Sequence, residues 1–168
     1  VVRVLGVDAA IRRRSYAPGQ LARLRVSADA HMLAVQIFRC GPETANTDRP
    51  DEMKGVAVTA PVGYDWKANR DAPHTLWLKL GDWPTGLYFA KLTAPGRVGF
   101  APFVVAPSRL GENEAAIVMP TRTWQAYNFR DDDGNGWGDT WYAKGAQSTA
   151  RLGRMYIRRG VPPQWRKY

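Results

Sequence analysis

An acidic segment near the C-terminal end has the residue spacing closest to that of a metal site. Asp131, Asp133 and Asn135 stand at alternate positions, and Asp139 follows after Gly136 and Gly138. Short oxygen side chains at this spacing match positions one, three, five and nine of a calcium-binding EF-hand loop. Position twelve, where that loop needs a bidentate glutamate, is Tyr142. The segment therefore predicts at most a weak Ca²⁺ site, and the alternative is a solvated turn.

The other residues that could do chemistry stand alone. Neither His31 nor His74 has a Cys, His or Glu nearby at ligand spacing, so we expect both on the surface. Cys40 is the single cysteine, which excludes an intramolecular disulfide, and it ends an apolar strand. No serine lies in the context of a nucleophile elbow. We therefore expect no catalytic residue in this chain.

Charge and aromatic content each suggest a ligand class. The 168 residues carry a formal net charge of +9, which favours contact with acidic groups, but no nucleic-acid motif accompanies it and we do not expect nucleic-acid binding. Four aromatic residues could stack on sugar rings, and the alternative is that they fill the core and rim of the fold. They are Tyr64, Trp66, Trp77 and Trp83.

Alternating apolar residues indicate the elements that would position these side chains. Leu24 with Val26, and Tyr88 with Leu92, share the two-residue period of half-buried strands. Turn sequences rich in Pro and Gly separate about seven such strands within residues 1–107, the first of them at 1–5. This pattern predicts an antiparallel β-sandwich of immunoglobulin or fibronectin type. The expected inner residues are Leu24, Val26, Val35, Ile37, Leu78, Tyr88 and Val104.

The pattern changes after residue 107. Residues 115–119 form a continuous apolar run, typical of a strand buried on both faces, and Thr123 could cap a following helix. We therefore predict two domains, a sandwich over 1–107 and the start of an α/β domain over 108–168. An α/β domain needs several such units, and the chain begins with Val1 rather than Met. We expect a processed protein or a piece of a longer one, cut inside its second domain.

Four segments carry a family resemblance: 14–20, 82–90, 101–105 and 119–128. The most specific is Pro120-Thr121-Arg122-Thr123-Trp124-Gln125-Ala126-Tyr127-Asn128, supported by the closing Gly160-Val161-Pro162-Pro163. In this order and spacing they resemble the N-terminal part of proteins related to the large (β) subunit of N,N-dimethylformamidase. The resemblance implies a β-sandwich followed by an α/β domain of amidotransferase-like fold.

The resemblance also implies a function. In the characterised enzyme an iron held by Tyr and Glu activates water against an amide, and we expect those ligands to lie outside this chain. Trp124, Gln125, Tyr127 and Asn128 follow the end of a predicted strand, where α/β proteins bind ligands, and could line a substrate pocket. We therefore expect a non-catalytic accessory region of a dimethylformamidase-like amide hydrolase. The alternative is a self-contained sandwich module that binds a glycan or calcium.

Partners follow from the same expectation. The first is the remainder of the parent polypeptide, and a second is another copy of the chain in a homo-oligomer. The longest apolar runs have about five residues, so we expect no membrane-spanning segment. The sequence is compatible with a cytoplasmic location or with export after removal of a signal.

Overall fold

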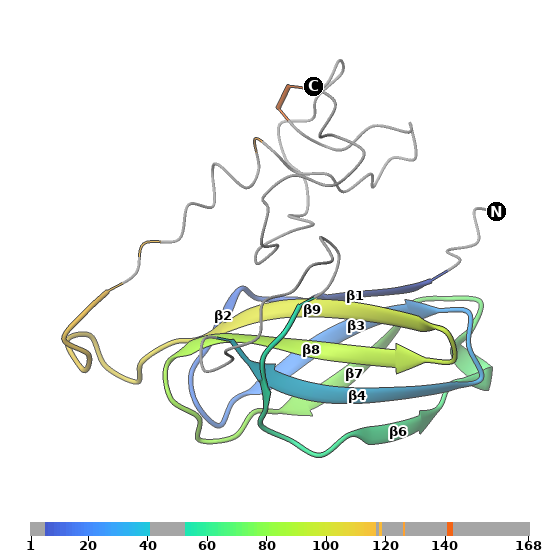
Figure 1. Ribbon diagram of the computed structural model, residues 1–168, viewed down its shortest axis with the longest axis horizontal. Coiled ribbons are helices and arrows are strands. Elements are labelled where there is room, and N and C mark those ends of the chain that lie inside the picture. Colours follow the sequence, from blue (N-terminus) through green and yellow to red (C-terminus); the bar gives the residue numbers. More distant parts are fainter. Residues whose placement is uncertain (1–5, 41–52, 117, 119–125, 127–140, 143–168) are drawn as a thin grey trace. The chain divides into compact units, whose positions relative to one another are not determined.

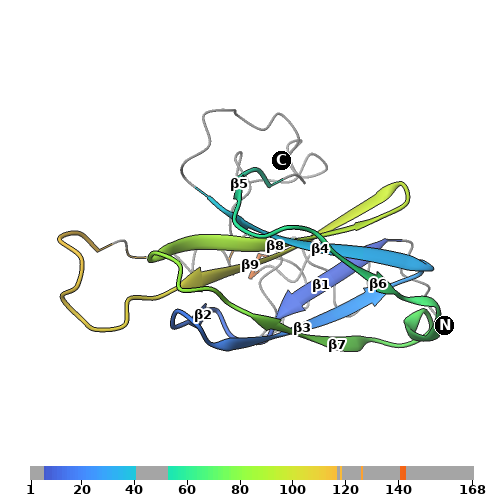
Figure 2. The ribbon, with the colours of Figure 1, turned by 90° about the horizontal axis from the view of Figure 1, so that it is seen from below.

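The structure, a computed structural model, describes residues 6–40 and 53–116, together with 118, 126, 141 and 142. The chain divides into two compact units, one of residues 1–46 and 54–114, the other of residues 47–53 and 115–168. The first unit is a sandwich of two β-sheets (Figures 1 and 2). The predicted mainly β fold is therefore confirmed for this unit, while the expected strand at 1–5 lies outside the described residues.

The smaller sheet has three antiparallel strands. Strand β3 (Leu21–Ala28) lies between β1 (Val7–Ile11) and β7 (His74–Lys79). Ala22, Leu24, Val26 and Ala28 alternate with polar or exposed residues along β3 and are buried. The two-residue period therefore gives this sheet one face in the core and one face in solvent.

The larger sheet has six strands in the order β2-β9-β8-β4-β5, with β6 also paired to β4. Its centre consists of β4 (Met32–Arg39), β8 (Gly86–Ala94) and β9 (Arg97–Val105), which pair antiparallel. Strand β2 (Ser15–Tyr16) pairs parallel to the end of β9. In Figure 2 this sheet forms one layer over the layer of β1, β3 and β7. These pairings have the two-sheet arrangement of immunoglobulin-like sandwiches.

The edge of the larger sheet beside β4 is interrupted. Strands β5 (Val56–Ala57) and β6 (Val62–Asp65) pair with opposite ends of β4, and Ala60-Pro61 lies between them. Proline has no N–H for the ladder, so a continuous strand is disfavoured here. Thr59 fills the gap, because its hydroxyl accepts from the Ile37 N–H at 3.0 Å and its carbonyl accepts from Gln36 Nε2 at 2.8 Å.

The core between the sheets is apolar and aromatic. Of the expected inner residues, Leu24, Val26, Val35, Ile37 and Tyr88 are buried, and Leu78 is partly buried against the core. The expectation that Val104 faces inward is wrong. Its neighbours Phe103 and Val105 point inward, and Val104 points outward. The run 103–105 is apolar throughout, so its sequence lacks the alternation that would indicate which residues face inward.

Tyr88 anchors the turn that leads into β8. Its hydroxyl donates to the Pro84 carbonyl at 2.7 Å, and its ring stacks between Trp83 and Phe103 at centroid distances of 5.5 and 5.8 Å. A tyrosine that bonds back to the backbone a few residues upstream is a feature of immunoglobulin-like sandwiches. Burial raises the pKa of the Tyr88 phenol above its usual range, and the positive charge of Arg39 opposes this effect.

Beyond β9 the described residues form no strand. Ala115 and Ala116 are exposed coil, and Val118 is 91% exposed, so the predicted buried strand over 115–119 is wrong at these positions. A continuous apolar run has no period from which a strand can be recognised with certainty. Ala126 is helical and buried. The rest of the predicted α/β start lies outside the described residues.

Candidate functional site

The residues predicted to do chemistry fall outside the described part of the chain. This holds for the proposed pocket residues Trp124, Gln125, Tyr127 and Asn128, and for the proposed calcium ligands Asp131, Asp133, Asn135 and Asp139. Ala126, between two of the pocket residues, is buried. Both sites therefore remain predictions from the sequence.

The four aromatic residues considered for sugar stacking do not form one platform. Trp66 is 1% exposed and belongs to the core, where its ring meets His74 edge-on at 5.7 Å. Tyr64 and Trp83 are partly buried against the same core. Trp77 is 59% exposed on β7. Three of the four therefore have the packing role that was the alternative.

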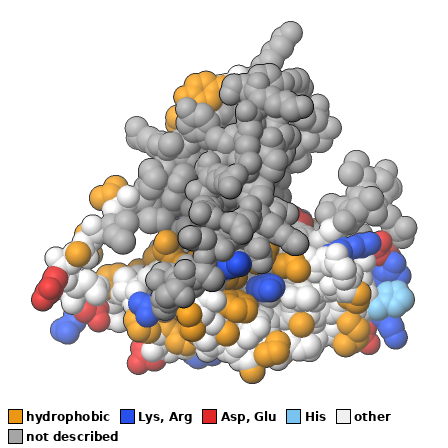
Figure 3. Space-filling view, in the orientation of Figure 1, with side chains coloured by type: hydrophobic (Ala, Val, Ile, Leu, Met, Phe, Trp, Pro, Cys, Tyr) orange, Lys and Arg blue, Asp and Glu red, His pale blue; other side chains and the backbone are white. Residues whose placement is uncertain are grey.

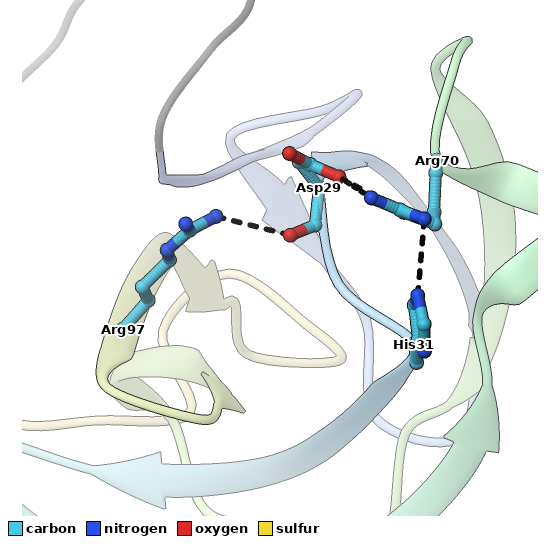
Figure 4. A network of polar contacts seen from close by, with 4 residues as sticks. All are labelled: Asp29, His31, Arg70 and Arg97. Atoms are coloured by element: carbon cyan, nitrogen blue, oxygen red, sulfur yellow. Dashed lines mark hydrogen bonds and ion pairs between the residues drawn. The ribbon is translucent and has the colours of Figure 1, made fainter.

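A polar network closes one end of the sandwich (Figure 4). The Arg70 side chain donates from Nε and Nη2 to Asp29 Oδ1 at 2.9 and 2.5 Å, and its Nη1 lies 3.0 Å from His31 Nε2. Arg97 Nη1 donates to the Asp29 carbonyl at 3.0 Å. Since a guanidinium only donates, His31 Nε2 is the acceptor in this contact. His31 is exposed, as predicted.

The network joins three connections far apart in the chain. Asp29 and His31 lie between β3 and β4, Arg70 follows the short 3₁₀ helix η1 (Lys67–Asn69), and Arg97 begins β9. The Arg70 and Arg97 contacts to Asp29 span 41 and 68 residues of sequence. Local patterns do not predict such contacts, so sequence reasoning missed the network. Its bonds are internal to the fold, which gives it a structural role.

The outward face of the larger sheet is unusually apolar. The two-residue period directs alternate residues of β4, β8 and β9 away from the core. Six apolar residues of these strands face outward, and we call them the outer apolar face. They are Phe38, Leu87, Phe89, Phe100, Pro102 and Val104. Figure 3 shows hydrophobic side chains gathered on the side of the sandwich that faces the viewer.

Phe89 is the centre of the outer apolar face. Although it points away from the core, it is 1% exposed. Its ring stacks on Phe38 at 5.2 Å and meets Phe100 at 5.8 Å. Gly55 passes so close that a Cβ there would lie 3.0 Å from the Phe89 ring. An antiparallel sheet normally has one apolar and one solvated face, whereas the outward face of this sheet is largely apolar too, with Gln36, Lys91 and Thr93 as its polar residues.

Two described tyrosines and one glutamate, the residue types that would hold the iron, bond to backbone groups. The Tyr88 hydroxyl donates to Pro84, and the Tyr16 hydroxyl accepts from the Arg13 N–H at 3.1 Å. Glu112 accepts from the Arg109 N–H in the exposed segment after β9. Within the described ranges, no three His, Cys, Asp or Glu residues are grouped to hold a metal ion. The described helices include none long and apolar enough to cross a membrane.

Comparison with solved structures finds matches of low similarity. BslA, a bacterial hydrophobin, aligns with 61% of this chain and 99% of its own at 17% identity and a TM-score of 0.33. The M1 domain from titin aligns with 64% and 95% at 12% identity and a TM-score of 0.29. Spo0M, a sporulation control protein from Bacillus subtilis, aligns with 72% and 53% at 14% identity and 0.30. The fold assignment therefore rests on the strand pairings.

A search of curated proteins finds no match. A family model does match, over residues 34–161, and it is described as N,N-dimethylformamidase beta subunit-like, C-terminal. The resemblance to the N-terminal part of such proteins is therefore corrected, since motifs identify relatives without fixing their place in a longer polypeptide. The family itself is confirmed. The chain belongs to the N,N-dimethylformamidase β subunit-like family, matching its C-terminal domain.

Proposed function

We propose that the chain is a non-catalytic accessory region of a dimethylformamidase-like amide hydrolase. In this proposal the sandwich supports the catalytic part of the parent polypeptide by packing against it through the outer apolar face. The observation that carries the proposal is the cluster of half-buried apolar side chains around Phe89 on the outward face of the larger sheet. Five of the six residues of the outer apolar face keep part of their surface accessible, and contiguous accessible apolar surface is a mark of interaction sites.

The described polar groups support an accessory role. The Asp29 network joins three connections within the sandwich, and the Tyr88 and Tyr16 hydroxyls bond to backbone groups. Each of these groups stabilises the fold and is used within it. The alternative is a self-contained sandwich module that binds a glycan or calcium, the latter through Asp131, Asp133, Asn135 and Asp139.

The test compares two substitutions on the same face of the larger sheet in the parent polypeptide. Phe100→Glu places a charge within the outer apolar face, whereas Thr93→Glu places it at an exposed position of β8 that is already polar. We expect Phe100→Glu to lower both the yield of the assembled hydrolase and its dimethylformamide turnover by about tenfold, and Thr93→Glu to leave both unchanged. Unchanged assembly and turnover in Phe100→Glu would contradict the proposal.

A further inference from the structure

The solvent face of the smaller sheet differs from the outer apolar face in its chemistry. Arg23 and Arg25 on β3 and Lys79 on β7 share this face, together with Trp77 and Leu21. Asp8 is the one acidic residue in the three strands. Trp77 is 59% and Leu21 57% exposed, so the face combines positive charge with accessible apolar surface. We call it the Arg–Trp face.

Cross-strand pairing arranges the Arg–Trp face in rows. Leu21 lies opposite Lys79, Arg23 opposite Trp77, and Arg25 opposite Thr75. Exposed Arg12 extends the middle row at the other edge, because its N–H donates to the Arg23 carbonyl at 3.0 Å. Neighbouring strands lie about 4.8 Å apart, so Arg12, Arg23 and Trp77 follow one another across the sheet.

The pair at the centre has the geometry of a preorganised anion receptor. The Arg23 guanidinium lies over the Trp77 ring, 5.3 Å from its centroid. A stacked guanidinium is held in place by the ring yet keeps its in-plane N–H donors available for a carboxylate. The guanidinium covers one face of the ring, and that face is then not available for a base or a sugar to stack on.

The spacing along β3 favours a polypeptide ligand. Arg23 and Arg25 point to the same side and are two residues apart, or about 6.8 Å at a rise of about 3.4 Å per residue. An extended peptide with acidic residues at alternate positions has carboxylates at the same repeat. Exposed Trp77 and Leu21 add the apolar contacts that are common in protein interfaces, where Trp and Arg often dominate binding.

We infer that the Arg–Trp face binds an extended acidic peptide segment with carboxylates at alternate positions. Arg23 and Arg25 pair with successive carboxylates, Trp77 holds Arg23 in position, and Lys79 and Arg12 add positive charge at the two edges. This binding site is distinct from the outer apolar face and lies on the other sheet of the sandwich.

The test uses a fluorescently labelled peptide of twelve residues that alternates Glu and Thr, titrated with the full chain at low salt and followed by anisotropy. We expect binding that weakens about tenfold in the double variant Arg23→Gln with Arg25→Gln, or about 1.4 kcal/mol, because two charge-assisted pairs are lost. The control double variant, Lys67→Gln with Arg109→Gln, makes the same charge change at exposed positions elsewhere and should bind like the wild type.

Further peptides and variants separate register from charge. We expect a peptide of the same composition with its six Glu in one block to bind more weakly than the alternating peptide. A peptide in which every Glu of the alternating peptide is replaced by Gln should not bind. Trp77→Ala should weaken binding several-fold while Trp77→Phe retains most of it, with circular dichroism confirming that each variant folds. The inference is overturned if the arginine double variant binds as tightly as the wild type, or if the alternating peptide fails to bind. It is also overturned if oligothymidylate or heparin binds more tightly through the same arginines.

Discussion

Tyr88 shows how one polar side chain secures an otherwise apolar core. Replacing it with Phe keeps the ring stacking but removes the 2.7 Å bond to the Pro84 carbonyl. We expect the free energy of unfolding at neutral pH to fall by about 0.5–1.5 kcal/mol. Chemical denaturation of Tyr88→Phe and wild type measures this difference, and equal midpoints would show that the bond is not stabilising.

The same residue predicts a dependence on alkaline pH. Burial raises the pKa of the Tyr88 phenol above that of an unfolded chain, which is about 10. The folded state therefore holds this proton more tightly, so its contribution is complete below pH of about 10 and is lost as pH rises through the folded-state pKa. Relative to wild type, Tyr88→Phe should show a shallower loss of stability above pH of about 10. The control Tyr64→Phe, which keeps Tyr88, should follow the wild type.

Among the elements, β9 of the larger sheet passes close to β1 of the smaller sheet. A Cβ on Gly99 would lie 2.5 Å from the Val7 carbonyl oxygen, a backbone atom that cannot rotate away. We expect Gly99→Ala to lower the melting temperature, at a cost of about 1–3 kcal/mol. Gly63→Ala is the matched control, because nothing lies within 4 Å of its Cβ position. Equal melting temperatures for the two variants would contradict this account.

The connections at one end of the sandwich depend on Arg70. Its replacement by Ala leaves Asp29 without two charge-assisted bonds and His31 without its donor. Since Arg70 is about one-third exposed (34%), we expect a loss of about 1 kcal/mol, smaller in 1 M salt. Lys67→Ala, at an exposed position nearby, should change little. Thermal unfolding of both variants at two salt concentrations measures the effect.

Sequence patterns predicted the elements of the sandwich better than its details. Alternation in 24–26, 33–37 and 88–92 identified strands and their inward residues, because a two-residue period reports which face is buried. The apolar run 103–105 lacks that period, so Val104 was placed on the wrong face. The Asp29–Arg70–Arg97 network and the Arg23–Trp77 pair depend on pairings between distant segments, which only the folded chain brings together.

At the scale of the whole molecule, the sandwich has two outward faces of contrasting chemistry. One is apolar and belongs to the larger sheet, and the other is cationic with an exposed Trp and belongs to the smaller. Such a pair suits an accessory domain, which packs against one neighbour and remains able to bind another. The competing proposal is that Asp131, Asp133, Asn135 and Asp139 bind calcium.

The calcium alternative makes its own prediction. Without a glutamate at position twelve, the Asp131 segment should bind Ca²⁺ no more tightly than about 10⁻⁴–10⁻³ M. Saturating metal would then stabilise the chain by roughly 1–3 kcal/mol. Asp131→Ala with Asp133→Ala should abolish this increment and leave the melting temperature without calcium nearly unchanged. If millimolar calcium does not move the wild-type melting temperature, the segment is a solvated turn.

Dimethylamine release from N,N-dimethylformamide tests directly whether this chain is a non-catalytic accessory region. The purified chain, assayed with and without added iron, should release no more amine than buffer with the same metal, because a non-catalytic accessory region supplies no groups that activate water. The matched sample is the chain carrying Tyr16→Phe and Tyr88→Phe, which removes both hydroxyls that bond to the backbone. Turnover above background in the wild-type chain, lost on substitution of any of its residues, would contradict the proposal that it is an accessory region.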